Sequence, residues 1–337
     1  FSVSMNLWSM LFLLFISSLT MFMSGLIANF EYDLKKIIAL STLSQLGLMM
    51  SILALGEMML SFFHLLMHAL FKALLFMCAG CVIHNLNNCQ DIRFMGSLIK
   101  FMPLTGSFFN ICNLSLCGLP FLSGFYSKDL ILEFMSMGYI NLYVYLIFYL
   151  STGLTVMYSV RLLYFTMMGD YNGMNYISLV DSSEKMMKGM SGLIIMVIFG
   201  GGVMSWLMFP TPYFICLPFF MKMMVLLTIL FGVNLGFMIT SVSFNDLSKT
   251  LKFYNLSFFL SSMFNLNYLT SFGTTFYFLK FGEKLNFNLD QGWFEYYGSQ
   301  NIYFSMKSMS MFMQNLFLNN MKMFLTLFIL WICLIMF

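Results

Sequence analysis

Three ionisable side chains recur at helical spacing within one apolar stretch of the sequence. His64, His68 and Lys72 are four residues apart, so a helix would place them on one face within about 12 Å of axial rise. A neutral imidazole can accept a proton on one nitrogen and donate one from the other. The spacing therefore predicts a row of groups that relays protons. The alternatives are a structural seam of hydrogen bonds between helices and a metal site built on the two histidines.

A second group of charges follows a segment that is poorly suited to a continuous helix. Within residues 118–129, Pro120 removes a backbone donor and two glycines weaken the helix around it. We expect a broken helix here, with Lys128 just past the break. Asp129 and Glu133 then either pair with this lysine or form a proton exit. Broken helices at this depth expose backbone groups to ions or water inside the protein.

The composition shows which solvent surrounds these charges. Of 337 residues, 60% are hydrophobic and 9% charged, with 42 Phe and 36 Met, whereas soluble domains contain about 25% charged residues. Lipid must therefore surround most of the chain, and a lysine at the middle of a span costs roughly 2.5 to 3.5 kcal/mol. A net charge of +3 without a concentrated basic face argues against nucleic acid as a partner. The excess of Phe, Met, Leu, Asn and Tyr favours a mitochondrial gene.

Apolar runs near the length of a bilayer crossing define the architecture. Because backbone polar groups in hydrocarbon must be satisfied within their own segment, we expect an all-α integral membrane protein, a multi-span helical bundle of about eight spans with one broken helix. The runs are residues 5–28, 34–54, 59–86, 102–136, 141–168, 190–209, 222–243 and 321–337.

The basic residues test this topology. If the spans alternate sides, twelve Lys and Arg residues fall on one side, while the opposite loops near 55–58, 137–140 and 210–221 hold none. The basic side is then the matrix side of a mitochondrial membrane. Arg161 lies inside a span, about two turns from its basic end, and we expect it to snorkel in a structural role.

Four ordered segments carry a family resemblance. They are DLKKIIALSTLSQLG at 33–47, HLLMHALFKALLFMCAG at 64–80, HNLNNCQDIRFMG at 84–96 and GLPFLSGFYSKDLILE at 118–133. With them the chain resembles the C-terminal part of the chain 5 family of NADH:ubiquinone oxidoreductase (complex I), whose members are mitochondrially encoded, antiporter-like membrane subunits related to Mrp-type cation/proton antiporters. The dense part of this resemblance covers about the first 40% of the sequence.

The resemblance implies a function and a site. His64, His68 and Lys72 look like the family's hydrophilic axis, Lys128 looks like the lysine of its second broken helix, and Asp129 is similar to the acid that follows it. It implies a proton-translocating subunit of the respiratory chain in the mitochondrial inner membrane, coupled to NADH oxidation and ubiquinone reduction elsewhere in a hetero-oligomer. The family's first half-channel has no match, so we expect an N-terminal part to be missing.

The C-terminal region distinguishes this family from the related subunits 2 and 4, because the resemblance implies a long lateral helix before a last span, which those subunits lack. Residues 290–320 carry an apolar stripe that includes Ile302, Met306 and Met309. Few charges on the polar face favour a protein partner, other membrane-arm subunits, over lipid headgroups. The alternative is a helix folded back on its own bundle. The expected organisation is an antiporter-like bundle incomplete at its N-terminus (1–209), a further span and polar connection (210–289), the lateral helix (290–320) and a C-terminal transmembrane anchor (321–337).

Cofactor sites are not expected in this chain. GxGxxG is absent and the cysteine spacing does not suit cluster ligation, so FMN and iron–sulfur clusters are expected in other subunits. Cys78 and Cys81 form a CxxC in an apolar helix, where we expect small-residue packing. Two other functions stay open: a stand-alone Mrp-type antiporter subunit, and a structural brace of the membrane arm without its own proton path.

Overall fold

Helices make up almost all of the regular structure in the computed structural model. It describes residues 5–138, 142–173, 179–181, 183–240, 254–262, 264–266, 268–318 and 320–337. Within these ranges the extended pairing is a single isolated bridge between Asp33 and Asp91. The expected all-α class is confirmed. The chain divides into two units, residues 1–264 and 265–337, and each is described by itself.

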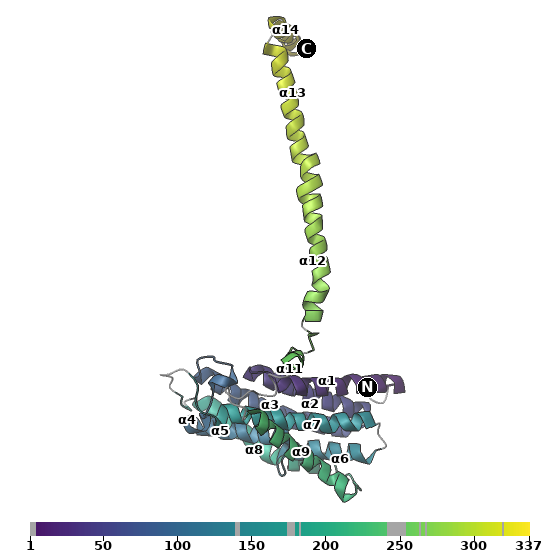
Figure 1. Cartoon of the computed structure of the whole chain (residues 1–337), viewed down its shortest axis with the longest axis vertical. Helices are drawn as coiled ribbons and strands as arrows, with labels where there is room; N and C mark the ends of the chain where they lie inside the picture. Colours follow the sequence, from purple (N-terminus) through teal and green to yellow (C-terminus); the bar gives the residue numbers. More distant parts are fainter. Residues whose placement is uncertain are drawn as a thin grey trace. The chain divides into compact units, whose positions relative to one another are not determined.

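The first unit is a bundle of long helices (Figure 1). Helix α2 packs between α1 and α3, α3 also contacts α5 and α8, and α7 contacts α1, α5 and α9. The helices are α1 (Leu7–Ala28), α2 (Leu34–Ala54), α3 (Met58–Asn85), α4 (Leu98–Phe101), α5 (Pro103–Cys117), α6 (Leu130–Met137), α7 (Leu142–Leu163), α8 (Glu184–Met208), α9 (Phe219–Thr240) and α11 (Tyr254–Ser261), with the short turns η2 (Ile92–Phe94), η3 (Phe125–Asp129) and η4 (Tyr164–Met168).

Six helices of the described residues are long and apolar enough to cross a membrane: α1, α2, α3, α7 continued through η4, α8 and α9. The two other predicted runs differ from these. The run 102–136 is divided into α5 and α6 by a break, and the run 321–337 is the 16-residue helix α14 (Met321–Met336). The chain is therefore a multi-pass membrane protein with an interrupted helix, as predicted.

The interruption follows from local sequence. Helix α5 begins at Pro103, whose fixed φ suits a first helical position, and ends before Gly118, which adopts the left-handed conformation with φ 85°. Phe121 also has a positive φ of 71°. The chain then resumes helical geometry in the π-helical turn η3 and continues into α6. Proline and glycine at these positions account for the break.

Two glycines of α9 explain its close packing on α7. A Cβ on Gly232 would lie 2.7 Å from the Gly153 carbonyl oxygen, and a Cβ on Gly236 would lie 3.0 Å from Val160 Cβ. The two residues are four apart and share a helix face, the small-xxx-small pattern that brings membrane helices into close contact. Dispersion contacts along this seam stabilise the α7–α9 pair.

Loop contacts identify the two ends of the bundle. At one end the Leu34 N–H donates to the Gln90 carbonyl at 2.9 Å, and the Ile92 N–H donates to the Tyr32 carbonyl at 3.0 Å. At the other end the Tyr213 hydroxyl donates to Glu57 Oε2 at 3.1 Å. The loops before α2 and after α3 thus share an end, and the loops before α3 and after α8 share the other. This agrees with the alternation of sides predicted from the basic residues.

Arg161 corrects one expectation. Its side chain is buried, with 5% exposed, and does not snorkel. Its guanidinium donates to the carbonyl oxygens of Asn29 at 2.6 Å and Glu31 at 2.8 Å, and lies 4.8 Å from the centre of the Tyr32 ring. The carbonyls at and after the end of α1 lack helical donors and carry the negative end of the helix dipole. They satisfy the charge within the protein, so snorkelling is unnecessary.

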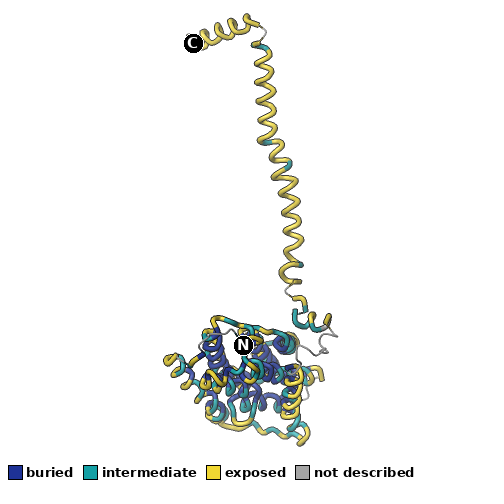
Figure 2. Tube along the Cα trace, turned by 60° about the vertical axis from the view of Figure 1, so that its left-hand side comes forward, coloured by how far each residue is buried: buried dark blue, intermediate teal, exposed yellow. Residues whose placement is uncertain are grey.

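The second unit is one long helical stretch followed by α14. The stretch runs from Tyr268 to Leu318, which at helical rise corresponds to roughly 75 Å. Most of its residues are exposed, and Figure 2 colours them yellow. The described part of the predicted lateral helix, residues 290–318, lies within it. The elements are η5 (Tyr268–Gly273), α12 (Thr274–Leu285), η6 (Asn286–Trp293), η7 (Tyr296–Gln300), α13 (Asn301–Leu318) and α14.

Candidate proton-translocation site

The row of ionisable side chains on α3 faces the interior of the bundle. The exposed fractions are 1% for His64, 9% for His68 and 4% for Lys72. Helix α3 can bury one face in this way because α2, α5 and α8 all pack against it. A polar row inside an apolar bundle requires hydrogen-bond partners from those neighbours.

His64 has a partner on each ring nitrogen. Its Nδ1 lies 3.0 Å from Ser127 Oγ on η3, and its Nε2 lies 3.2 Å from Gln45 Oε1 on α2. The imidazole therefore connects the middle of α2 to the broken helix. The side chains of His64, Gln45 and Ser127 are all buried, so these two contacts are shielded from bulk water.

Lys72 and His68 differ in how their polar atoms are satisfied. Lys72 Nζ donates to the Ser41 hydroxyl on α2. His68 packs its ring edge-on against Phe71, with centroids 5.4 Å apart, and its Nε2 has no hydrogen-bond partner in the described part of the chain. The His64 and His68 ring centres are 6.3 Å apart. Transfer of a proton between these rings therefore needs a bridging group.

Lys128 shows how the break creates a binding place for an ammonium group. In an unbroken helix the Leu116 carbonyl would accept from the N–H of residue 120, but Pro120 has no N–H. The freed Leu116 oxygen accepts from Lys128 Nζ at 3.4 Å, and the hydroxyl Oγ1 of Thr155 on α7 accepts at 2.8 Å. The lysine is 3% exposed. The same proline that interrupts α5 thus supplies an acceptor for the buried cation.

The two acidic residues do not pair with this lysine. Among the ion pairs of the described residues, none joins Lys128 to Asp129 or Glu133. Asp129 is 7% exposed, its Oδ1 has no hydrogen-bond partner in the ranges described, and this oxygen packs close to Gly118. Glu133 lies one turn further along α6 and is partly exposed. Of the two predicted roles, the structure lacks the pairing, and the exit role stays a prediction.

Four partner residues were absent from the predicted site: Ser41, Gln45, Ser127 and Thr155. Each carries a hydroxyl or amide that contacts a titratable side chain of the row or the broken helix. A signal for two of them exists in the sequence, because Ser41 and Gln45 stand four residues apart and share a face of an otherwise apolar helix. The spacing does not show which neighbouring helix that face contacts.

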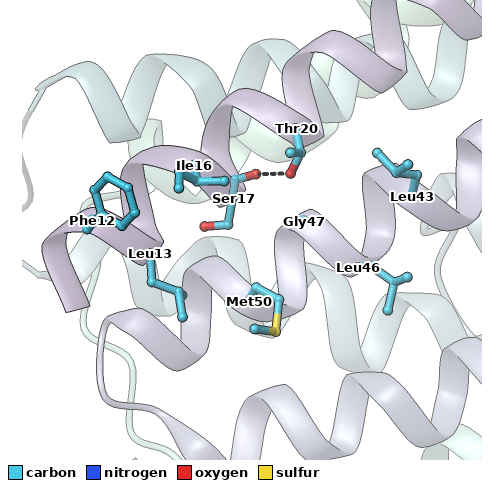
Figure 3. A pocket seen from close by; sticks show the side chains of 9 residues that line it. All are labelled: Phe12, Leu13, Ile16, Ser17, Thr20, Leu43, Leu46, Gly47 and Met50. Atoms are coloured by element: carbon cyan, nitrogen blue, oxygen red, sulfur yellow. Dashed lines mark hydrogen bonds between the residues drawn. The ribbon is translucent and has the colours of Figure 1, made fainter. Parts of the chain in front are cut away.

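Other sequence features lie apart from this cluster. Cys78 and Cys81 are buried free thiols, and the Cys78 sulfur lies 3.7 Å from the Met190 sulfur on α8, a packing contact. A cavity of about 390 Å³ opens between α1 and α2. Figure 3 shows its apolar lining, where the Thr20 hydroxyl bonds back to the Ser17 carbonyl. The cavity contains none of the predicted site residues; it is lined by Phe12, Leu13, Ile16, Ser17, Thr20, Leu43, Leu46, Gly47 and Met50.

Comparison with known protein families decides the relationship. Residues 1–156 match the family described as NADH:quinone oxidoreductase/Mrp antiporter, TM, and residues 158–337 match NADH dehydrogenase subunit 5 C-terminus. The chain belongs to the NADH dehydrogenase subunit 5 family. The second match covers more than half of the sequence, so the specific resemblance extends well beyond the first 40% on which the sequence analysis depended.

Individual relatives of this subunit 5 family member agree. NADH-ubiquinone oxidoreductase chain 5 of Anopheles gambiae is 52% identical over 98% of this chain and 57% of its own length, and that of Locusta migratoria is 50% identical over 95% and 56%. The chain thus spans somewhat more than half the length of these relatives. A chain in the solved Mrp complex of Dietzia sp. DQ12-45-1b has a TM-score of 0.55 at 22% identity, over 74% of this chain and 30% of that chain, a likeness of fold.

Proposed function

We propose that this chain is part of a proton-translocating membrane-arm subunit of respiratory NADH:ubiquinone oxidoreductase. The observation that carries the proposal is the buried cluster in which His64 contacts both α2 and the broken helix, with Lys72 and Lys128 in the same bundle interior. Intramembrane ionisable residues inside a bundle are characteristic of proton pathways. The identity to chain 5 relatives favours this function over a stand-alone antiporter.

Each residue has a proposed part in the path. Lys72 and Lys128 hold protons on amines whose hydrogen-bond acceptors are hydroxyl and carbonyl oxygens, and among the described residues neither amine forms an ion pair with a carboxylate. His64 and His68 pass protons between these amines, because an imidazole can accept and donate at different nitrogens. Asp129 and Glu133 continue the polar path from Lys128 toward the end of the bundle where Glu57 lies, and we assign the exit to them.

The setting of the subunit follows from the same proposal. We place it in the mitochondrial inner membrane with its basic loops on the matrix side, surrounded by lipid and by other membrane-arm subunits of the complex. The long helix is the surface proposed to contact those subunits. NADH oxidation, FMN and the iron–sulfur clusters are assigned to other subunits, since the sequence lacks a dinucleotide fingerprint and cluster spacing. This chain then contributes the proton path without a redox cofactor of its own.

The proposal is tested by replacing Lys72 or Lys128 with Ala in the assembled complex. Each variant removes a proton-holding amine, and we expect the rate of proton transfer along this path to fall at least about tenfold, the effect of roughly 1.4 kcal/mol on a transfer barrier, so that fewer protons are translocated per NADH oxidised. The measurement is acidification outside reconstituted vesicles together with NADH consumption.

Lys188→Ala is the matched control, because it removes a lysine whose side chain is 81% exposed at the surface of α8. It should leave the ratio of protons to NADH unchanged. Normal ratios in both Lys72→Ala and Lys128→Ala would leave the subunit as a structural brace. A cation-dependent proton exchange by this chain without NADH or quinone-reducing subunits would instead identify an antiporter.

A further inference from the structure

The hydroxyl of Ser127 occupies a junction that the proton path described above does not use. It is fully buried, lies on the π-helical turn η3, and contacts His64 Nδ1 from the position directly before Lys128. We propose that Ser127 is a positioning residue whose hydroxyl reverses its hydrogen bond when His64 gains a proton, and so links the charge of the α3 row to the broken helix. This inference rests on the proposed function.

The neutral state of His64 fixes the direction of the first arrangement. Gln45 Oε1 is an acceptor, so the nitrogen facing it, Nε2, carries the proton in the neutral ring. Nδ1 is then a lone-pair acceptor, and the Ser127 O–H donates to it across 3.0 Å. Both contacts are satisfied at once by a single tautomer. Neutral His64 is therefore held with a defined donor toward α2 and a defined acceptor toward η3.

Protonation of His64 forces the second arrangement. Both ring nitrogens of an imidazolium are donors, so Nδ1–H must donate to Ser127 Oγ, and the serine can no longer point its own hydrogen at the ring. The carbonyl oxygens of Ser123 at 3.5 Å and Gly124 at 3.4 Å already lie within hydrogen-bond distance of the hydroxyl and accept its hydrogen in this arrangement. No atom has to move far, because rotation about the Cβ–Oγ bond is sufficient.

The new acceptors belong to the broken helix itself. Ser123 and Gly124 precede η3 directly, and Ser123 packs against Gly201 of α8, where a Cβ would lie 2.6 Å from Ser123 Cα. The hydroxyl therefore keeps its contact with α3, now as an acceptor, and turns its own hydrogen to the segment that carries Lys128. The charge of His64 therefore acts on η3, the turn that contains Lys128, in two ways: by changing the hydrogen bond of Ser127 and by direct electrostatic interaction.

Ser127→Ala tests this switch in the assembled complex, and Ser123→Ala is the matched control. Both serines are fully buried on the same segment, and the Ser123 hydroxyl has no hydrogen-bond partner among the described residues. We expect Ser127→Ala to slow proton transfer along this path roughly tenfold, the effect of losing about one hydrogen bond, and so to lower the number of protons translocated per NADH. Ser123→Ala should stay within about twofold of the wild-type ratio.

Variants that keep part of the hydroxyl chemistry at position 127 distinguish a hydrogen-bond switch from a role in packing alone. Ser127→Thr keeps the hydroxyl and should retain translocation within about threefold of wild type, and Ser127→Cys, a weaker donor of similar shape, should fall between Ser and Ala. If Ser127→Ala prevents assembly, the Cys variant still gives the result. Equal ratios for Ser127→Ala and Ser123→Ala, or for Cys and wild type, would overturn the switch. Normal translocation in both Lys72→Ala and Lys128→Ala would overturn the proposed function itself, whereas loss in these variants with normal translocation in Ser127→Ala overturns the switch alone.

Discussion

Buried cations in this bundle are satisfied by neutral oxygens. Arg161 donates to two backbone carbonyls, Lys128 to a carbonyl and a hydroxyl, and Lys72 to a hydroxyl. The ion pairs of the described residues instead lie outside the core, where side chains are more exposed. A buried carboxylate partner would hold a lysine in its charged form. Hydroxyl and carbonyl acceptors stabilise the proton less strongly, which suits the proton release that we propose for these lysines.

Arg161 makes this point testable for stability. Replacing it with Ala removes two charged hydrogen bonds and leaves the carbonyls of Asn29 and Glu31 without their donor, and each such bond contributes about 1.5 to 3 kcal/mol. We expect the thermal denaturation midpoint of the purified complex to fall clearly, with Arg161→Lys intermediate because an ammonium group lacks the planar guanidinium fork.

Arg93→Ala is the comparison for that prediction. Arg93 stacks on the same Tyr32 ring at 4.2 Å, but its side chain is 47% exposed and its partner is Asp91. An exposed pair of this kind contributes about 0 to 1 kcal/mol, so its loss should be small. Equal decreases in the two variants would contradict the structural importance assigned to the buried arginine.

At the scale of elements, the broken helix could be predicted from sequence and the contacts of the broken helix could not. Pro120 and Gly118 act on their own segment, so the break is a local property. The partners of His64 and Lys128 come from α2 and α7, and they depend on how far each helix slides and rotates against its neighbour. Hydrophobic periodicity gives a buried face but no register between helices. The sequence of α7 therefore does not identify Thr155 as a partner of Lys128, because that contact depends on how α7 packs against the broken helix.

The expectation that Arg161 snorkels is wrong for the same reason. The sequence places it about two turns from the basic end of its span, a distance over which a long side chain can reach water. The structure brings the end of α1 to that place, and its carbonyls are nearer than the membrane surface. A residue on one helix was satisfied by the terminus of another, which no pattern along α7 could indicate.

The loop after α3 provides a prediction that depends on pH. The Arg93 guanidinium donates to both Asp91 oxygens and lowers the pKa of that carboxyl through this hydrogen bond. The folded pKa therefore lies below the unfolded value of about 3.9. The stabilisation is complete above that pH and is lost as pH falls through the folded pKa.

Hydrogen exchange of the 88–95 segment measures the effect. After correction for intrinsic rates, the Ile92 amide bonded to Tyr32 should lose protection in wild type between about pH 5 and pH 2. In Asp91→Asn the side chain has no charge to lose, so protection should be lower at neutral pH and nearly independent of pH. A wild-type segment whose protection stays constant over this range would refute the assigned importance of the pair.

At the scale of the molecule, the two units differ in what holds them together. The first unit contains the buried apolar core, whereas no described residue between Tyr268 and Met336 is buried within the second. An isolated helix gains little from hydrogen bonds alone and depends on burial of an apolar face. The stripe that the sequence indicates, with Met306 and Met309, is exposed within the second unit, and its contact with other membrane-arm subunits stays a proposal.

Deleting residues 290–337 tests that proposal in the complex. The core lies in the first unit, so we expect the bundle to remain folded and inserted while the distal membrane arm loosens, releasing neighbouring subunits at lower detergent concentration. Native mass spectrometry over a detergent series measures the release. Met306→Asn with Met309→Asn should weaken retention in the same direction, because polar side chains reduce the area available to an apolar partner. Ser305→Asn with Ser308→Asn, on the polar face of the same turns, is the matched control and should behave as wild type. Unchanged subunit composition after the deletion would remove the bracing role, since the helix would then have no partner whose loss could be detected.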